Sequence, residues 1–133
     1  MRAFPFPLMP AGALSVGVDL IEVPRIAHAV ERWGERFLRR VYTANEIALC
    51  DGRIPELAVR FAGKEAISKA LGTGLVGVDW TEMEILADFR GKPIVRLLGR
   101  ARRRADELGL HRWAISLTHT KDYAMAMVVA GGA

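Results

Sequence analysis

The segment from Pro55 to Leu71 constrains the fold most, because apolar residues occupy most sides of the helix that its spacing predicts. The apolar positions are Leu57, Ala58, Phe61, Ala62, Ala66, Ile67, Ala70 and Leu71. A helix that is apolar on most sides is stable only when other elements cover it. We therefore expect a central, mostly buried helix with the rest of the chain packed around it.

Two carboxylates interrupt apolar segments. Glu65 lies on an apolar face of this helix, and Asp19 interrupts the strand predicted over residues 15–21. Burying a carboxylate is costly unless a cation or hydrogen-bond donors compensate it. Phe61, Glu65 and Lys69 are spaced by four and share one helix face. The pattern indicates a metal site; the alternative is an exposed Glu–Lys helical pair worth a few tenths of a kcal/mol, roughly.

The next segments predict two further helices before the central one. Pro24 is suited to the first position of a helix that runs to Val41. Its apolar residues form one core-facing stripe, namely Ile26, Val30, Trp33, Phe37 and Val41. Thr43 and Glu46 have the spacing of a capping box, which starts a short helix that ends near Gly52.

Four strands and one helix are predicted in the second half. The strands cover residues 83–89, 93–98, 113–117 and 123–129, and a basic helix covers residues 100–108. The element order is therefore β-α-α-α-β-β-α-β-β, and the fold class is α+β.

The chain has 133 residues, of which 51% are hydrophobic and 26% charged, which suits one compact domain. We place that domain at residues 13–133, after a proline-broken tail at residues 1–12 that makes a poor signal peptide. Cys50 is the only cysteine, so no intramolecular disulfide forms, which fits the cytoplasm. The longest apolar run, residues 123–133, is too short to span a bilayer, so we expect no membrane association.

Arginines are concentrated on the predicted 24–41 helix. Arg25, Arg32, Arg36 and Arg39 are spaced to form a stripe beside the apolar one. The net charge of the chain is +4, so the stripe is a candidate docking face for an acidic partner. The alternative is a solvated helix face, because glutamates are interspersed among the arginines.

Three segments resemble one known family. Residues 60–74 (RFAGKEAISKALGTG) are similar to the central signature of the holo-acyl-carrier-protein synthases, which are small phosphopantetheinyl transferases. Residues 17–26 (GVDLIEVPRI) and residues 115–124 (ISLTHTKDYA) resemble two further motifs of the same family, in the same order. The resemblance covers nearly the whole chain after the first dozen residues.

The resemblance implies an enzyme that transfers 4′-phosphopantetheine from coenzyme A to a serine of apo acyl carrier protein, for fatty acid biosynthesis. It implies Mg²⁺ as cofactor, with Asp19 and Glu65 as ligands and Lys69 at the transferring phosphate. It also implies a homotrimer with sites between subunits. The matched positions would bind coenzyme A phosphates through Arg60, Lys64 and His119, and the carrier protein through Arg25, with Arg32 on the same face.

A second interpretation is a basic module that binds nucleic acid or an acidic protein without catalysis. It would use a cluster of arginines, namely Arg96, Arg100, Arg102, Arg103, Arg104 and Arg112. No recognised nucleic-acid motif surrounds this cluster. Such a module has no need of Asp19, Glu65 and Lys69 on buried faces, so we expect the enzyme and no nucleic-acid partner.

Overall fold

The computed structural model of the chain describes residues 14–132, so the predicted tail at residues 1–12 lies outside the described residues. The elements in chain order are β1 (Leu14–Glu22), α1 (Val23–Trp33), α2 (Glu35–Val41), α3 (Ala44–Cys50), α4 (Ile54–Ala70), the 3₁₀ helix η1 (Trp80–Glu82), β2 (Met83–Ala87), β3 (Pro93–Leu97), α5 (Gly99–Glu107), β4 (Arg112–His119) and β5 (Tyr123–Gly131). The α+β class and the predicted succession of helical and strand regions are confirmed.

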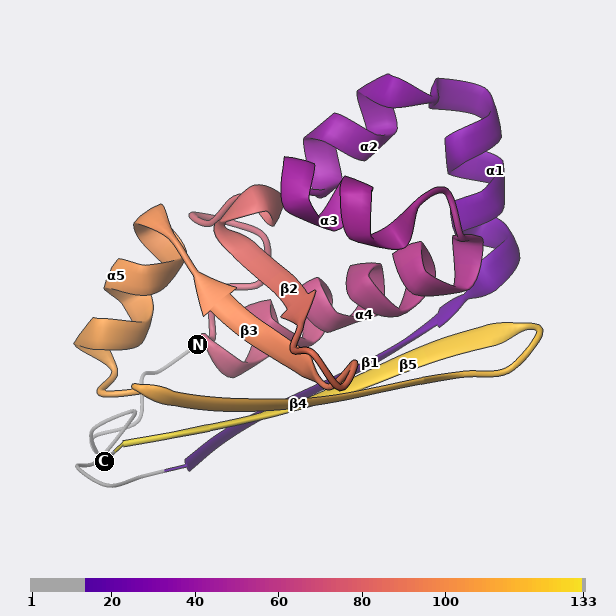
Figure 1. Cartoon of the computed structure of the whole chain (residues 1–133). Coiled ribbons are helices and arrows are strands. Elements are labelled where there is room, and N and C mark those ends of the chain that lie inside the picture. The colour runs from indigo at the N-terminus through magenta and orange to yellow at the C-terminus, as the bar shows by residue number, and fades with distance from the viewer. Residues whose placement is uncertain (1–13, 133) are drawn as a thin grey trace, which may run out of the picture.

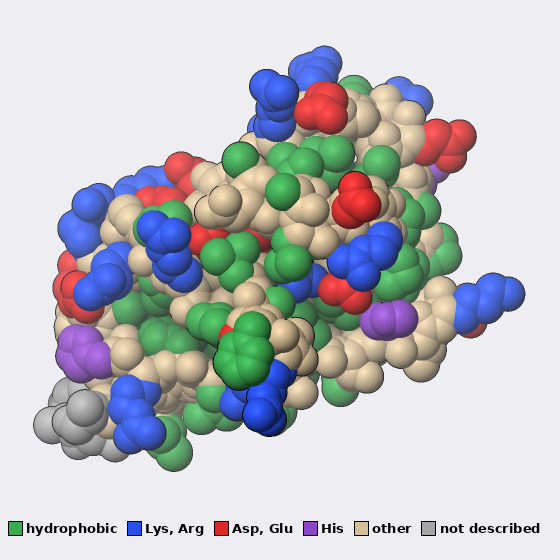
Figure 2. All heavy atoms as spheres, viewed as in Figure 1, with side chains coloured by type: hydrophobic (Ala, Val, Ile, Leu, Met, Phe, Trp, Pro, Cys, Tyr) green, Lys and Arg blue, Asp and Glu red, His purple; other side chains and the backbone are tan. Residues whose placement is uncertain are grey.

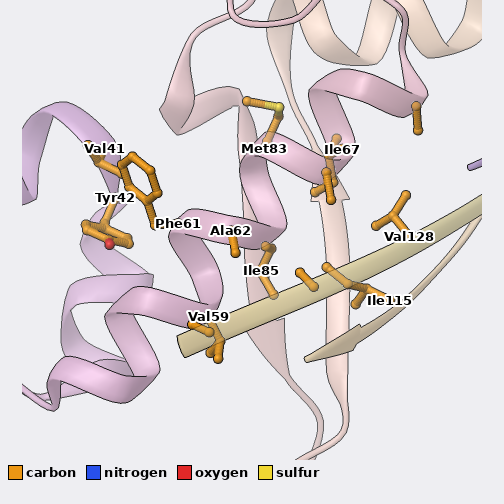
Figure 3. Close-up of a cluster of buried hydrophobic side chains, with 14 of the residues drawn as sticks. Val41, Tyr42, Val59, Phe61, Ala62, Ile67, Met83, Ile85, Ile115 and Val128 are labelled. Carbon is orange, nitrogen blue, oxygen red and sulfur yellow. The ribbon is translucent and has the colours of Figure 1, made fainter. Parts of the chain in front are cut away.

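The strands form two antiparallel sheets, one with the order β1-β5-β4 and one with β2 and β3. Helix α4 lies against one face of the three-stranded sheet and also contacts β2, while β3 contacts β4 (Figure 1). Figure 3 shows Ala62 and Ile67 of α4 among side chains of both sheets, including Val128 and Ile85. The predicted central helix is confirmed, because Ala62, Ile67 and most of its neighbours on α4 are buried.

The helix predicted over residues 24–41 is divided into α1 and α2 at Gly34. Gly34 has φ 53° and ψ −130°, a conformation that favours glycine and ends the regular helix. Ile26 and Val41 are buried as predicted, but Trp33 is 48% exposed instead of facing the core. Periodicity fails at Trp33 because it assumes a straight helix axis, and the axis changes direction one residue later.

Strand β1 and helix α4 lie in close contact, on the strand face that carries Asp19. A Cβ atom at Gly17 would collide with the backbone carbonyl of Ala66, so only glycine allows the strand and helix to approach this closely. One face of β1 also carries Ser15, whose Oγ donates a 2.6 Å hydrogen bond to the carbonyl of Ala70. Asp19 follows Gly17 on that face.

Among residues 14–132, no helix is both long and apolar enough to cross a bilayer.

Candidate active site

Asp19 and Lys69 form the open ion pair of the candidate site. Lys69 Nζ donates to Asp19 Oδ1 at 3.2 Å and to the carbonyl of Val18 at 2.9 Å. The Lys69 side chain is 53% exposed, whereas that of Asp19 is 16% exposed. Asp19 Oδ2 is buried and has no hydrogen-bond partner. An unpaired buried carboxylate oxygen is costly, so this atom is available to a cation.

Glu65 is half-buried on α4, one turn before Lys69. Burial raises the pKa of Glu65, and the nearby Asp19 carboxylate raises it further, whereas Lys69 and Arg25 oppose the shift. A glutamate whose pKa is raised by a neighbouring carboxylate lies where a cation is favourable. The structure therefore brings Asp19, Glu65 and Lys69 into one cluster, as the sequence predicted.

The two carboxylates suit a hard cation. Among the described residues, no group of three or more His, Cys, Asp or Glu side chains could hold a metal ion. Mg²⁺ needs few protein ligands, because it retains several waters and accepts substrate phosphate oxygens. The unpaired Oδ2 of Asp19 and the adjacent carboxylate of Glu65 fit that requirement.

Arg25 also lies beside this cluster. Its guanidinium carbon is 5.5 Å from the centre of the Phe61 ring, and Phe61 is one helical turn before Glu65. Cation–π stacking on a mostly buried ring restrains an otherwise mobile side chain. Arg25 is thus exposed at the edge of the carboxylate cluster, where an acidic partner could reach it.

The predicted arginine stripe is divided by the break at Gly34. Arg32 is on α1 and stacks over Trp33 at 4.9 Å, whereas Arg36 and Arg39 are on α2. A shallow depression near the break is lined by Trp33, Arg36, Phe37, Arg39 and Arg40. The single straight stripe predicted from spacing is wrong, because Arg36 and Arg39 line this depression on α2 whereas Arg25 and Arg32 are on α1.

His119 is exposed at the end of β4. It pairs with Ala124 of β5, which pairs with Ile21 of β1. Two strand spacings separate His119 from Ile21, which is roughly 10 Å. His119 therefore lies apart from the Asp19 cluster in the single chain, and its contact with coenzyme A stays a prediction.

The predicted role of Lys64 in binding a coenzyme A phosphate conflicts with the structure. The Lys64 side chain has no exposed surface, and Nζ donates to Glu46 Oε1 at 2.7 Å, to the Met83 carbonyl at 2.7 Å and to the Trp80 carbonyl at 2.9 Å. Those three bonds use all three ammonium donors. Lys64 therefore has no free donor for a phosphate.

Arg60 is also interior, with 3% of its surface exposed. Its Nε donates to the carbonyl of Ile85 at 2.9 Å, and its Nη1 forms a 2.8 Å ion pair with Glu56. The predicted phosphate contact of Arg60 is therefore not supported in this conformation. The motif places both cations near Glu65 in sequence, but side chains at neighbouring helical positions point in different directions.

Sequence reasoning missed Glu46 as an ion-pair partner and Gly17 as a contact point. Glu46 was predicted only as a capping residue, and the capping box with Thr43 is present. The signal for Gly17 was available, because glycine within an apolar strand often marks a close backbone approach. No local signal connects Glu46 to Lys64, since they are 18 residues apart.

The arginine cluster of the binding-module interpretation is largely paired with carboxylates. Arg100 contacts Asp79 at 3.1 Å, and Arg102 contacts Asp106 at 3.4 Å. Arg104 and Arg96 contact further glutamates. Figure 2 shows acidic side chains among the basic ones over α5. These pairs weaken the local positive field, so the cluster does not favour nucleic-acid binding.

Comparison with known proteins places the chain in a family. The family model described as "4'-phosphopantetheinyl transferase superfamily" matches residues 15–128. The chain therefore belongs to the 4′-phosphopantetheinyl transferase superfamily.

Similar proteins, found by sequence and by structure, include several holo-[acyl-carrier-protein] synthases. The holo-[acyl-carrier-protein] synthase of Herpetosiphon aurantiacus is 49% identical over 126 residues, which cover 90% of this chain and 99% of that protein. The crystal structure of the Helicobacter pylori holo-[acyl-carrier-protein] synthase in complex with coenzyme A has a TM-score of 0.79 at 29% identity, covering 86% of this chain and 98% of that one. The Bacillus anthracis synthase in complex with CoA (3',5'-ADP) has a TM-score of 0.75 at 32% identity, covering 91% and 100%.

Proposed function

We propose that this chain is a holo-acyl-carrier-protein synthase, which transfers 4′-phosphopantetheine from coenzyme A to a serine of apo acyl carrier protein and releases adenosine 3′,5′-bisphosphate. The observation that carries the proposal is the buried, unpaired Oδ2 of Asp19 beside Glu65 and Lys69. The similar synthases support the same activity, since solved members of that group contain coenzyme A.

Asp19 and Glu65 would hold Mg²⁺, which when bound supplies positive charge that stabilises the transferring phosphate. Lys69, with an exposed ammonium at the edge of the cluster, would bind the phosphate and offset negative charge on the leaving group. The carrier serine must lose a proton as its oxygen attacks phosphorus. Asp19 and Glu65 are both candidates to accept that proton.

Carrier docking would involve Arg25 and Arg32 on α1. Both are exposed, and Arg25 lies nearest to the carboxylate cluster. An acidic carrier protein would be guided by these charges towards the phosphate-binding end of the site. His119 would add a contact to coenzyme A from the end of β4.

The outer face of the three-stranded sheet supports a homotrimer. This face carries exposed apolar side chains on β1 and β5, namely Leu14, Val16, Val18, Leu20, Tyr123, Met125, Met127 and Val129. Adjacent apolar side chains at this density are typical of a surface covered by a partner. A trimer would place such faces together and bring neighbouring subunits close to one another's sites. Light scattering of the wild type and of Met127→Glu tests this, with dissociation expected in the variant.

The proposed place of this activity is fatty acid biosynthesis in the cytoplasm, carried out by one domain at residues 13–133. A single buried cysteine is consistent with a reducing compartment.

The deciding experiment is the intact mass of a purified apo acyl carrier protein after incubation with this protein, coenzyme A and Mg²⁺. We expect the carrier to gain the mass of one phosphopantetheine group, and a chelator to prevent that gain. An unmodified, folded carrier from the same source would contradict the proposal.

The binding-module interpretation predicts a different result in thermal melting. Coenzyme A with Mg²⁺ should raise the melting temperature of the transferase, because a ligand stabilises the state that it binds. A larger increase with nucleic acid than with coenzyme A would favour the binding module.

A further inference from the structure

The buried cations of α4 contact one edge of strand β2. Strand β2 pairs with β3 on one side only. On its other edge, the Ile85 carbonyl accepts from Arg60 Nε at 2.9 Å, and the Met83 carbonyl accepts from Lys64 Nζ at 2.7 Å. The Ile85 amide donates to Glu46 Oε2 at 2.9 Å. Side chains thus take the place of a third strand and satisfy the buried backbone groups of this edge.

Lys64 is the central member of this arrangement because it joins three elements to α4. Its ammonium contacts Glu46 on α3, the Trp80 carbonyl of η1 and the Met83 carbonyl of β2. Glu46 is itself fixed, since Oε1 also accepts from the Thr43 amide at 2.9 Å. Every polar atom of the Lys64–Glu46 pair has a partner, so the pair has one well-defined geometry.

The adjacent residue on α4 is Glu65. Successive side chains on a helix are about 100° apart, so fixing the direction of Lys64 also fixes the rotation of α4 about its axis. On the sheet side, the close contact of Gly17 with Ala66 limits movement of the same helix. Glu65 is therefore held between two restraints, one from β1 and one from the β2 edge.

We infer that Lys64, through Glu46 and the edge of β2, is a positioning residue that sets the direction of Glu65 towards Asp19 and thereby the affinity of the site for Mg²⁺. This inference rests on the proposed function, because it assumes that Asp19 and Glu65 hold the metal. It replaces the coenzyme A contact predicted for Lys64 with an indirect role.

The test compares Lys64→Met with the double variant Lys64→Met/Glu46→Gln, which removes both charges and does not leave Glu46 as an uncompensated buried ion. Arg103→Met, at an exposed position of α5, is a matched control for loss of one positive charge. For each folded protein we would measure the Mg²⁺ dissociation constant by calorimetry and the KM for coenzyme A at saturating Mg²⁺. We expect the Mg²⁺ dissociation constant to rise about tenfold in both Lys64 variants, as for other residues that orient metal ligands, with the KM unchanged.

An unchanged Mg²⁺ dissociation constant in a folded Lys64 variant would reduce the residue to a purely structural role and overturn the inference. A raised KM for coenzyme A at saturating Mg²⁺ would also overturn it, because that result indicates direct contact. If the wild type transfers phosphopantetheine and binds Mg²⁺, either result leaves the proposed function intact. A wild type that does neither would overturn both.

A second measurement needs no variant. Coupling between sites is reciprocal, so Mg²⁺ should slow hydrogen exchange of the Ile85 amide, which Glu46 holds. The amide of Ile115 on β4 reports the general stabilisation that any ligand produces. Equal slowing of both amides would contradict the coupling.

Discussion

Helix α4 carries two lysine–carboxylate pairs that differ in almost every physical property. Lys64 and Glu46 are 2.7 Å apart with no exposed surface, and their polar atoms are fully partnered. Lys69 and Asp19 are 3.2 Å apart, Lys69 is half-exposed, and Asp19 Oδ2 has no partner. The first pair has no exposed surface and no free donor for a ligand, whereas the second retains an acceptor and an accessible ammonium.

The difference shows how to separate structural from functional charges on one helix. Burial alone does not identify a site, since the most buried lysine of α4 is the one with the fewest free donors. Unsatisfied bonding capacity is more informative, because it marks where the molecule is incomplete without a ligand. By that criterion we propose that Asp19 and Lys69 belong to the site and that Lys64 supports it.

The largest effect is expected at the open pair. Asp19→Ala and Glu65→Ala should each reduce transfer by more than about a hundredfold, because each removes a proposed metal ligand. The free energy of unfolding should change little, since Asp19→Ala removes the unpaired Oδ2 and an ion pair with the half-exposed Lys69, and Glu65 is only half-buried. Intact-mass assays of the carrier and thermal melting of each variant test the two statements. Full activity in either folded variant would remove the metal assignment.

The free energy of unfolding should depend more on the buried Lys64–Glu46 pair than on the open Lys69–Asp19 pair. Glu46→Ala leaves the Lys64 ammonium buried without its counter-charge, which should lower the free energy of unfolding by about 3–5 kcal/mol. Lys69→Met, its matched control at the open pair, should cost less than about 1 kcal/mol. Urea unfolding of both variants gives the comparison. Similar losses would mean that the two pairs do not differ as their burial indicates.

A smaller effect is expected from removing the charge of Arg25, which lies at the edge of the open site. Arg25→Ala should raise the KM for the carrier protein by roughly five- to tenfold, the effect of losing a docking charge worth about 1 kcal/mol. The loss should shrink as salt is added, since exposed charges are screened. Steady-state kinetics across a salt series would show this. Kinetics equal to the wild type at every salt concentration would exclude Arg25 from docking.

The smallest effect is expected in the way Mg²⁺ affinity changes with pH. The pKa of Glu65 is raised by burial and by Asp19, so protons compete with Mg²⁺ at higher pH than for an ordinary glutamate. Mg²⁺ affinity should therefore fall as pH decreases through this raised pKa.

The same raised pKa has a defined effect on folding without metal. The folded state binds the Glu65 proton more tightly than the unfolded state, so this contribution to stability is fully present below the unfolded pKa and is lost as pH rises through the folded pKa. Melting temperatures of the wild type and Glu65→Gln across acidic pH, without Mg²⁺, should diverge with that sign. Melting curves that stay parallel across pH would show that folding does not raise the pKa of Glu65.

Residue patterns were sufficient to predict most of the elements and to propose Asp19, Glu65 and Lys69 as a site. Apolar periodicity identified α4 as central, and spacing by four placed Glu65 and Lys69 on one face. Asp19 was evident as a charge within an apolar strand. These features are local: they depend on residues within one turn or one strand, so a linear pattern records them.

Which charges are available to a ligand could not be predicted from residue spacing, because it depends on how distant segments pack. Lys64 contacts groups 16 to 19 residues away, and Lys69 contacts Asp19 at a separation of 50. The break at Gly34 likewise separated arginines that a straight helix would align. The physical reason is that a side chain's hydrogen-bond partners and burial depend on how distant elements pack, and helical spacing specifies neither.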